Sequence, residues 1–308
     1  MKAAYFMKTG GPEVLQYGDV ADPVAGPGQV LVDVHAASVN GADWKVRAGS
    51  YAPITKFPYI PGRDFSGVVG ALGDGVKDFK VGDTVFGVVE QTADSCYAEK
   101  VAIRAAIVAK KPAGLSQVEA ASLALIGLTA LVSIEDTLRL RSGETILIQG
   151  GAGGVASFAI QLAKHIGARV ISTASAANQD YVRGLGADQV IDYNVQDFAK
   201  AVSDCDAVFD TVGGEVATRS FAVVRPGGRA AFIGSGGAAP PSPRADVTSL
   251  RPKVGRDRAH LERIVALVAG GAVRVPEIRT YKLSEAAAAH RVSEGRHFRG
   301  KLVFKVRE

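Results

Sequence analysis

One stretch of this chain, QGGAGGVA at 149–156, restricts the fold more than any other. It follows the apolar run ETILI and leads into SFAIQLAKHIGARVI, which begins as an amphipathic helix. Glycines this dense lose chain entropy on folding and do not begin a helix by propensity, so they must meet a local geometric need. A strand, a glycine loop and a helix in this order form the unit that binds dinucleotides. We therefore predict a Rossmann domain; the alternative is a flexible glycine turn without a ligand.

The small residues of this loop have separate expected roles. Gly151 is expected to permit the tight turn, and Gly153 to let the backbone approach a pyrophosphate. Ala156 is small enough for the helix and the strand to pack closely. The helix should begin near Gly154 and direct its free N–H groups at the phosphates. The predicted phosphate-binding residues are Gly151, Ala152, Gly153, Gly154 and Val155.

The end of the next predicted strand lacks an acid. An NAD site usually places an aspartate or glutamate there to hold the ribose 2′-hydroxyl, whereas RVISTASAANQDY reaches its first acid only at Asp180. Because a carboxylate would repel a 2′-phosphate, its absence favours NADP over NAD. Ser175, Asn178 and Tyr193 are expected to donate hydrogen bonds there, and Arg183 to add charge.

The pattern of apolar segments divides the chain. The first 110 or so residues are rich in alternating runs and turn signals, as in a β domain. From Ser116, which forms a capping-box pattern with Glu119, helices alternate with strands. The strands are predicted at 145–149, 169–173, 188–191, 206–210 and 228–233. This alternation predicts a parallel sheet covered on both faces. A helix and an alternating strand, KLVFKV, follow Pro276.

Composition sets the broad class. The chain has 308 residues, of which 47% are hydrophobic and 22% charged, enough for two soluble domains. The apolar run 120–134 is shorter than a bilayer span and predicts a buried helix rather than a membrane segment. Cys96 and Cys205 are expected to be free thiols in a cytoplasmic protein. The basic run 244–263 has no interleaved aromatic residues, so we expect a solvated surface and no specific nucleic-acid partner.

Several stretches together resemble one family. SVNGADWKVRAGSY, PYIPGRDFSGVV, KVGDTVFG, IGLTAL, QGGAGGVA, GADQVIDY and DTVGG follow the order found in medium-chain dehydrogenases/reductases. The chain looks like the zinc-free, quinone oxidoreductase (zeta-crystallin-like) branch, and the resemblance covers nearly all of it. It implies a GroES-like, partly barrelled β domain of residues 1–115 and 274–308, with a Rossmann NADP-binding domain of residues 116–273 inserted between.

The resemblance also allows a test for zinc. Asn40 stands where the zinc-dependent branch has a cysteine ligand, and Gly62-Arg63-Asp64 replaces the GHE motif that supplies its histidine. An amide and an always-protonated guanidinium are poor zinc ligands. The histidines show no metal-ligand spacing. We therefore expect no catalytic zinc.

The resemblance implies a nicotinamide site in the cleft between the two domains. On the substrate side we expect Asn40, Asp43, Tyr51 and Arg63 as candidate catalytic residues. Tyr51 would donate a hydrogen bond to the acceptor, or else merely pack in its loop. Asp43 and Arg63 would act in catalysis, or else form an internal ion pair. The residues expected near the nicotinamide are Asn40, Thr129, Val212, Gly213, Phe232, Ile233, Gly234, Ser235, Phe298, Gly300 and Lys301.

Without zinc, no Lewis acid polarises a carbonyl. A quinone or a conjugated enone delocalises the charge that hydride addition creates, so the expected activity is NADPH-dependent reduction of such an acceptor. One alternative is an enoyl-thioester reductase that uses residues 244–258 for a CoA phosphate; another is a non-catalytic, crystallin-like or regulatory NADPH-binding protein. The segment 234–259 is rich in proline and arginine, a poor edge strand, which leaves the usual homodimer open.

Overall fold

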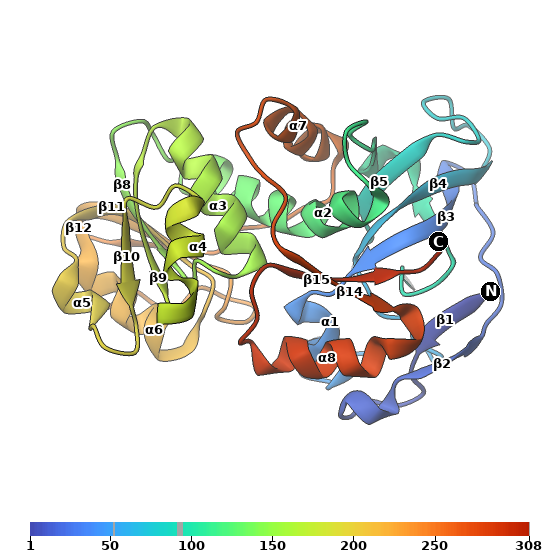
Figure 1. Cartoon of the computed structure of the whole chain (residues 1–308), viewed down its shortest axis with the longest axis horizontal. Coiled ribbons are helices and arrows are strands. Elements are labelled where there is room, and N and C mark those ends of the chain that lie inside the picture. The colour runs from blue at the N-terminus through green and yellow to red at the C-terminus, as the bar shows by residue number, and fades with distance from the viewer. Residues whose placement is uncertain (52, 91–94, 308) are drawn as a thin grey trace. The chain divides into compact units, whose positions relative to one another are not determined.

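The chain divides into two compact units. The computed structural model describes residues 1–51, 53–90 and 95–307. Unit 1 comprises Met1–Leu125, Arg256–Ala269 and Val275–Glu308, and unit 2 comprises Ile126–Gly255 and Gly270–Arg274. Figure 1 labels the elements of each unit.

Unit 2 is built on a six-stranded parallel sheet. Its strands stand in the order β10-β9-β8-β11-β12-β13, which is the doubly wound order of nucleotide-binding domains. The strands are β8 (Thr145–Gln149), β9 (Arg169–Ala174), β10 (Gln189–Asp192), β11 (Cys205–Asp210), β12 (Val224–Phe232) and β13 (Thr248–Leu250). The helices are α3 (Gly154–Ile166), α4 (Gln179–Gly184), α5 (Phe198–Ala201) and α6 (Gly214–Ser220). The predicted α/β fold class is confirmed.

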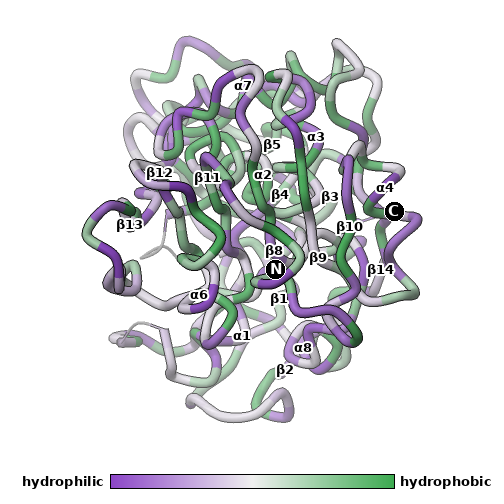
Figure 2. Tube along the Cα trace, turned by 90° about the vertical axis from the view of Figure 1, so that its left-hand side faces the viewer, coloured by the Kyte–Doolittle hydropathy of each residue, from purple (hydrophilic) through white to green (hydrophobic). Residues whose placement is uncertain are grey.

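The strands of this sheet are apolar because helices cover both faces. Leu147, Val208 and Phe209 are all fully buried, and the tube in Figure 2 is green along much of β11. The proline-rich segment 234–259 still supplies one strand, the three-residue β13, which pairs with β12 through Arg229–Ala231. The segment expected to be a poor edge strand thus does contribute an edge strand to this sheet, but one of only three residues.

Helix α2 (Gln117–Leu131) begins at the predicted capping box. The Ser116 hydroxyl accepts from the backbone N–H of Glu119 at 3.2 Å, and the Glu119 carboxylate accepts from the Ser116 N–H at 2.7 Å. The helix continues as the π-helical segment η3 (Val132–Thr137). Gln117–Thr137 is long and apolar enough to cross a membrane, but 78% of its most apolar window is buried. As predicted, it is a core helix.

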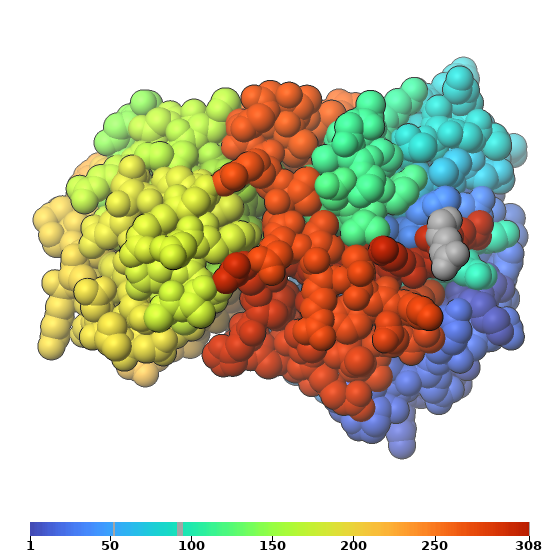
Figure 3. Space-filling model, in the orientation of Figure 1, coloured from blue at the N-terminus to red at the C-terminus, as the bar shows by residue number. Residues whose placement is uncertain are grey.

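Unit 1 is a mixed sheet that joins both ends of the chain. Its order is β14-β15-β3-β4-β5-β7, with β6 also paired to β3. Strand β15 pairs antiparallel with β3, so the last residues lie beside the first third of the chain, as the red and blue surfaces of unit 1 show in Figure 3. The strands are β3 (Gln29–Ser38), β4 (Asp64–Leu72), β5 (Thr84–Val88), β6 (Lys100–Arg104), β7 (Val108–Lys110), β14 (Ile278–Lys282) and β15 (Lys301–Lys305), with a separate hairpin of β1 (Lys2–Tyr5) and β2 (Gln16–Asp19).

Helices α1 (Gly41–Arg47), α7 (Arg258–Ala269) and α8 (Ala286–Gly295) accompany this sheet, and the first part of α2 also belongs to unit 1. Helix α7 belongs to unit 1, whereas the boundaries expected from the sequence assign it to the Rossmann domain. Its first residue explains the difference, because Arg258 donates from Nε to Val108 O at 2.9 Å and from Nη2 to Ala105 O at 2.8 Å. The side chain thereby satisfies carbonyls next to strand β7.

Candidate functional site

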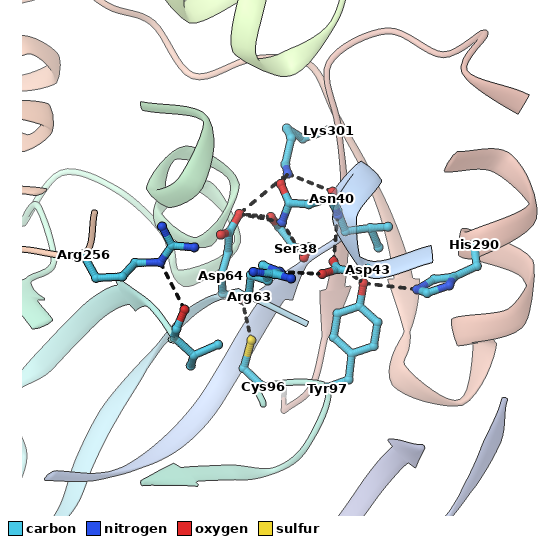
Figure 4. A network of polar contacts seen from close by, with 12 residues as sticks. Ser38, Asn40, Asp43, Arg63, Asp64, Cys96, Tyr97, Arg256, His290 and Lys301 are labelled. Atoms are coloured by element: carbon cyan, nitrogen blue, oxygen red, sulfur yellow. Dashed lines mark hydrogen bonds and ion pairs between the residues drawn. The ribbon is translucent and has the colours of Figure 1, made fainter. Parts of the chain in front are cut away.

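Asn40 lies between strand β3 and helix α1 and is the N-cap residue of the helix. Its backbone N–H donates to Asp43 Oδ2 at 2.9 Å, so the acid three residues into the helix folds back onto the cap. The Asn40 side-chain amide donates to Asp64 Oδ2 at 3.1 Å, and its oxygen accepts from Lys301 Nζ at 2.8 Å. Three segments distant in sequence therefore meet at Asn40 (Figure 4).

Lys301 and Asp64 form a buried pair beside this asparagine. Lys301 Nζ lies 3.6 Å from Asp64 Oδ2 and donates to Val39 O at 2.8 Å. Ser38 Oγ donates to Asp64 Oδ2 at 2.5 Å. Burial raises the pKa of Asp64 and lowers the pKa of Lys301, while the opposite charge of each partner acts against both shifts. Lys301 was expected from the sequence, but the role of Asp64, part of the GRD motif, was not.

Asp43 and Arg63 form the second buried pair. Arg63 Nε lies 3.7 Å from Asp43 Oδ1, and the two side chains are 6% and 1% exposed. Burial raises the pKa of Asp43 to about 6, against the lowering effect of Arg63. The Arg63 guanidinium also lies over the ring of Tyr51, 5.2 Å from its centroid. The structure thus connects all four predicted catalytic residues, from Asn40 through Asp43 and Arg63 to Tyr51.

A small cavity of about 10 Å³, roughly the volume accessible to one water, adjoins this pair. Its lining includes Asp43, Arg63, Glu90 and Ser95. Asp43 Oδ1 accepts no hydrogen bond from any residue within the described ranges. Both members of the second pair therefore line the cavity, together with the polar residues Glu90 and Ser95.

Two further members of this network were missed from the sequence. Tyr97 donates from its hydroxyl to Asp43 Oδ2 at 3.0 Å, and His290 Nε2 lies 3.4 Å from the same hydroxyl. In the sequence the histidines show only a lack of metal-ligand spacing, and no motif marks Tyr97. Cys96 is a buried free thiol, as predicted, whose Sγ contacts Asp64 O at 3.1 Å.

The glycine loop of unit 2 connects β8 to α3 as predicted. Helix α3 begins at Gly154, and its N-cap Gly153 offers no side chain to the first N–H groups. A Cβ at Gly153 would meet only Gly150 O, at 3.3 Å. The first N–H groups of helix α3 therefore have no capping side chain, which suits a pyrophosphate at this helix N-terminus. Ala156 is fully buried, in agreement with close packing of helix and strand.

The role expected of Gly151 needs correction. The residue with positive φ, and hence the one that makes the tight turn, is Gly150 at φ 77°. A Cβ on Gly151 would instead collide with Ser172 Oγ and Val182. Gly151 is required for packing against β9 and α4, because those side chains leave no room for a larger residue.

Of the residues expected at the ribose, Ser175 and Asn178 lie just after β9, Arg183 lies in α4, and Tyr193 follows β10. Asn178 Nδ2 donates to Ser175 Oγ at 3.2 Å, which places both polar side chains together. Tyr193 is 49% exposed. Arg183 forms an ion pair with Asp180 at 2.8 Å on the exposed face of α4. Ser175 and Asn178 are therefore neutral hydrogen-bonding side chains just after β9, whereas the charge of Arg183 is paired with Asp180.

The DTVGG segment closes the carboxyl end of β11. Asp210 Oδ1 accepts from Gly213 N at 2.7 Å, whereas its buried Oδ2 accepts no hydrogen bond from the described part of the chain. Burial raises the pKa of Asp210 to about 6. Gly213 has φ 83°, and a Cβ there would lie 2.5 Å from Gly234 O. Of the other expected residues, Thr129 and Phe232 are buried, Val212 is 39% exposed, and the buried Ser235 Oγ accepts no hydrogen bond from described residues.

The remaining expected residues lie in unit 1. Gly300 has φ 70°, and a Cβ there would collide with Glu277 O, so its backbone conformation alone explains the glycine. Phe298 packs partly buried against the core of unit 1. These two positions have structural reasons that do not depend on a cofactor.

The residues at the zinc-ligand places do not suit zinc. The Asn40 oxygen already accepts from the Lys301 ammonium, and Arg63 carries a fixed positive charge that Asp43 balances. Among the residues that the structure describes, no group of three or more histidine, cysteine, aspartate or glutamate side chains could hold a metal ion. The donor set therefore consists of matched ion pairs rather than free ligands.

Two family models match the chain. Residues 26–127 match the alcohol dehydrogenase GroES-like domain, and residues 185–304 match the family described as zinc-binding dehydrogenase. The residues at the zinc-ligand places, Asn40 and Arg63, lie outside the second match.

Curated relatives share much of the sequence. The chain is 33% identical to the NADPH-dependent alkenal/one oxidoreductase of Arabidopsis thaliana over 98% of this chain and 79% of the relative. It is 38% identical to the 2-methylene-furan-3-one reductase of Solanum lycopersicum over 81% of this chain and 66% of the relative. The match thus leaves about a third of the tomato protein uncovered.

Solved structures agree in fold. The quinone oxidoreductase of Coxiella burnetii has a TM-score of 0.90 and 37% identity, covering 100% of this chain and 99% of that one. The Escherichia coli quinone oxidoreductase complexed with NADPH has a TM-score of 0.89 and 28% identity, covering 99% and 100%. Together with the ion pairs at the zinc-ligand places, these similarities show that the chain belongs to the zinc-free quinone oxidoreductase branch of the medium-chain dehydrogenases/reductases.

Proposed function

We propose that this chain transfers hydride from NADPH to a quinone or an α,β-unsaturated carbonyl compound without zinc. The observation that carries the proposal is the Arg63 guanidinium. It is 5% exposed, pairs with Asp43, and lies over the ring of Tyr51. A buried positive charge that lines a polar cavity suits an acceptor oxygen.

The chemistry follows from that charge. NADPH, when bound, supplies the hydride. As an enone or quinone accepts it, negative charge builds on the acceptor oxygen, and Arg63 would stabilise that charge by N–H donation. Asp43 holds the guanidinium in place, and Tyr51, 42% exposed, offers a second donor at the same oxygen. The acceptor delocalises its own charge, so the reaction does not require a Lewis acid.

The nucleotide is assigned to unit 2. The glycine loop would hold the pyrophosphate through backbone N–H groups at the start of α3. Ser175, Asn178 and Tyr193 would hold the 2′-phosphate as neutral donors. Support comes from the relatives, because one is named as NADPH-dependent and a similar structure contains NADPH.

The alternative of an enoyl-thioester reductase is less well supported. Its CoA phosphate would need free arginines between residues 244 and 258. Arg244 pairs with Asp246, Arg251 donates to Phe232 O at 2.7 Å, and Arg258 donates to carbonyls of unit 1. These side chains already serve the fold.

The test is NADPH oxidation, followed by absorbance, with quinones, enals, enones and enoyl-CoA thioesters in parallel. We expect quinones or enones to be reduced and the thioesters to react far more slowly. Arg63→Lys keeps the charge but loses the planar fork and the stacking on Tyr51, so kcat/KM should fall at least tenfold, about 1.4 kcal/mol. Arg225→Lys, at a partly exposed ion pair with Asp206 in unit 2, is the matched control. NADPH binding without turnover of any acceptor would favour the non-catalytic alternative.

A further inference from the structure

A continuous line of buried hydrogen bonds runs from Asp43 to the surface of unit 1. Tyr97 Oη lies 3.0 Å from Asp43 Oδ2 and 3.4 Å from His290 Nε2, and Figure 4 shows these three side chains in sequence. On the far side of the imidazole, Arg47 Nη1 lies 3.1 Å from His290 Nδ1. Arg47 also pairs with Glu294, which is 29% exposed and ends the line at solvent.

The direction of every bond in this line is determined by Arg47. A guanidinium only donates, so His290 Nδ1 must accept and the ring proton must sit on Nε2. Nε2–H then donates to Tyr97 Oη, and the Tyr97 hydroxyl proton points to Asp43 Oδ2. Burial, followed by the charge of Arg47, lowers the pKa of His290 to about 3, so the imidazole stays neutral and keeps this tautomer.

The line ends on the acid that pairs with Arg63. Asp43 Oδ2 accepts from Tyr97 Oη and from Asn40 N, which leaves Oδ1 to face Arg63. The other charged groups that act on Asp43 are Asp64 and Lys301. Two donors on one oxygen favour the ionised carboxylate against the cost of burial, and they fix the plane in which Oδ1 meets the guanidinium.

We propose that Tyr97, His290 and Arg47 are positioning residues that keep Asp43 ionised and directed at Arg63, so that Arg63 is held ready for the acceptor oxygen. The inference rests on the proposed function of Arg63. None of these three residues touches the acceptor in this account, and each acts through the next. Such a preorganised second layer is what holds a reacting group within the narrow tolerance that catalysis needs.

The test uses Tyr97→Phe, which keeps the ring and removes the hydroxyl. The first readout is the ¹³C carboxyl NMR titration of Asp43 in the whole protein, assigned by its disappearance in Asp43→Asn. Without the Tyr97 donor, the titration midpoint should rise by roughly one pH unit, a tenfold tighter hold on the proton. The acid limb of the pH profile of kcat/KM should move by the same amount, while the NADPH dissociation constant stays unchanged.

Tyr281→Phe is the matched control, because the Tyr281 hydroxyl is buried in unit 1 and has no hydrogen-bond partner among described residues. It should leave both the midpoint and the profile at their wild-type values. At position 290, His290→Leu should shift the midpoint in the same direction as Tyr97→Phe. His290→Gln can still donate to Tyr97 and accept from Arg47, so it should restore the wild-type midpoint.

The outcomes separate the two proposals. A wild-type Asp43 midpoint in Tyr97→Phe, or equal behaviour of the leucine and glutamine variants, would overturn the positioning role while wild-type enzyme still turns over quinones or enones. A shifted midpoint with a shifted acid limb supports it. If the wild-type protein reduces no such acceptor, the proposed function fails, and the role assigned to this line of residues in the reaction fails with it.

Discussion

The replacement Asp43→Asn should remove a large pH dependence of folding stability. The pKa of Asp43 in the folded chain is raised to about 6 from 3.8, mainly by burial. The folded state therefore holds a proton on this group more tightly than the unfolded chain does. The associated stability is fully present below pH 3.8 and is lost as the pH rises through about 6.

The size of the effect follows from the difference between the two pKa values. The interval from 3.8 to about 6, at 1.36 kcal/mol per pH unit, gives a loss of about 3 kcal/mol by neutral pH. Asparagine does not titrate, and it can still accept hydrogen bonds from Tyr97 and Asn40. The stability of the variant relative to the wild type should therefore rise by about 2.4 kcal/mol between pH 4 and pH 7, because part of the loss already occurs below pH 4, on top of a constant offset from the lost pair with Arg63.

The assay is urea unfolding of both proteins at several pH values, followed by near-ultraviolet circular dichroism. Only the difference between the variant and the wild type is interpreted, because Asp64 and Asp210 also have raised pKa values and tilt both curves in the same direction. A difference in unfolding free energy that stays constant from pH 4 to pH 7 would refute the reasoning. Asp43 would then titrate alike in the folded and unfolded chains.

Three further predictions concern the nucleotide and the metal. NADPH should bind at least tenfold tighter than NADH in a fluorescence titration. Ser175→Asp should reduce that preference, because it places a carboxylate against the 2′-phosphate. Equal affinities of the wild-type protein for NADPH and NADH would contradict the assignment. Gly153→Val should weaken NADPH binding at least tenfold and lower the stability of the cofactor-free protein by only about 1–2 kcal/mol. Gly151→Ala should lower that stability more, because its Cβ would meet Ser172 and Val182. Normal NADPH binding by Gly153→Val would mean that the loop is only a structural turn. Elemental analysis should find no stoichiometric zinc, and a chelator should leave turnover intact; activity lost with one zinc per chain would show a metal site after all.

The sequence predicted the parts of this molecule that local patterns determine. The strand, the glycine loop and helix α3 follow from residues adjacent in the chain, and so does the capping box at Ser116. Asn40 and Arg63 were found because they occupy recognisable motif positions. The turn at Gly150 was assigned to its neighbour because two adjacent glycines give no sequence signal of which one takes a positive φ.

The line from Asp43 to Arg47 was not predictable in this way. Its members come from helix α1, the segment before β6 and helix α8, which only the folded sheet of unit 1 brings together. In the sequence, a histidine after AAAA is indistinguishable from an exposed helical residue, yet His290 is fully buried. A buried imidazole between an arginine and a tyrosine depends on long-range packing, which neither periodicity nor motif reveals.

The charges of the site explain why the fold can dispense with zinc. Asp43 is matched by Arg63 and Asp64 by Lys301, and all four side chains are 6% exposed or less. Each buried charge thus has an opposite partner within 3.7 Å. A divalent cation placed among them would add two positive charges where no unmatched carboxylate remains, and the fixed charges of Arg63 and Lys301 would repel it. In the proposed function, the positive charge that a zinc ion would place at a carbonyl oxygen would come instead from the guanidinium of Arg63, which stays protonated at every physiological pH.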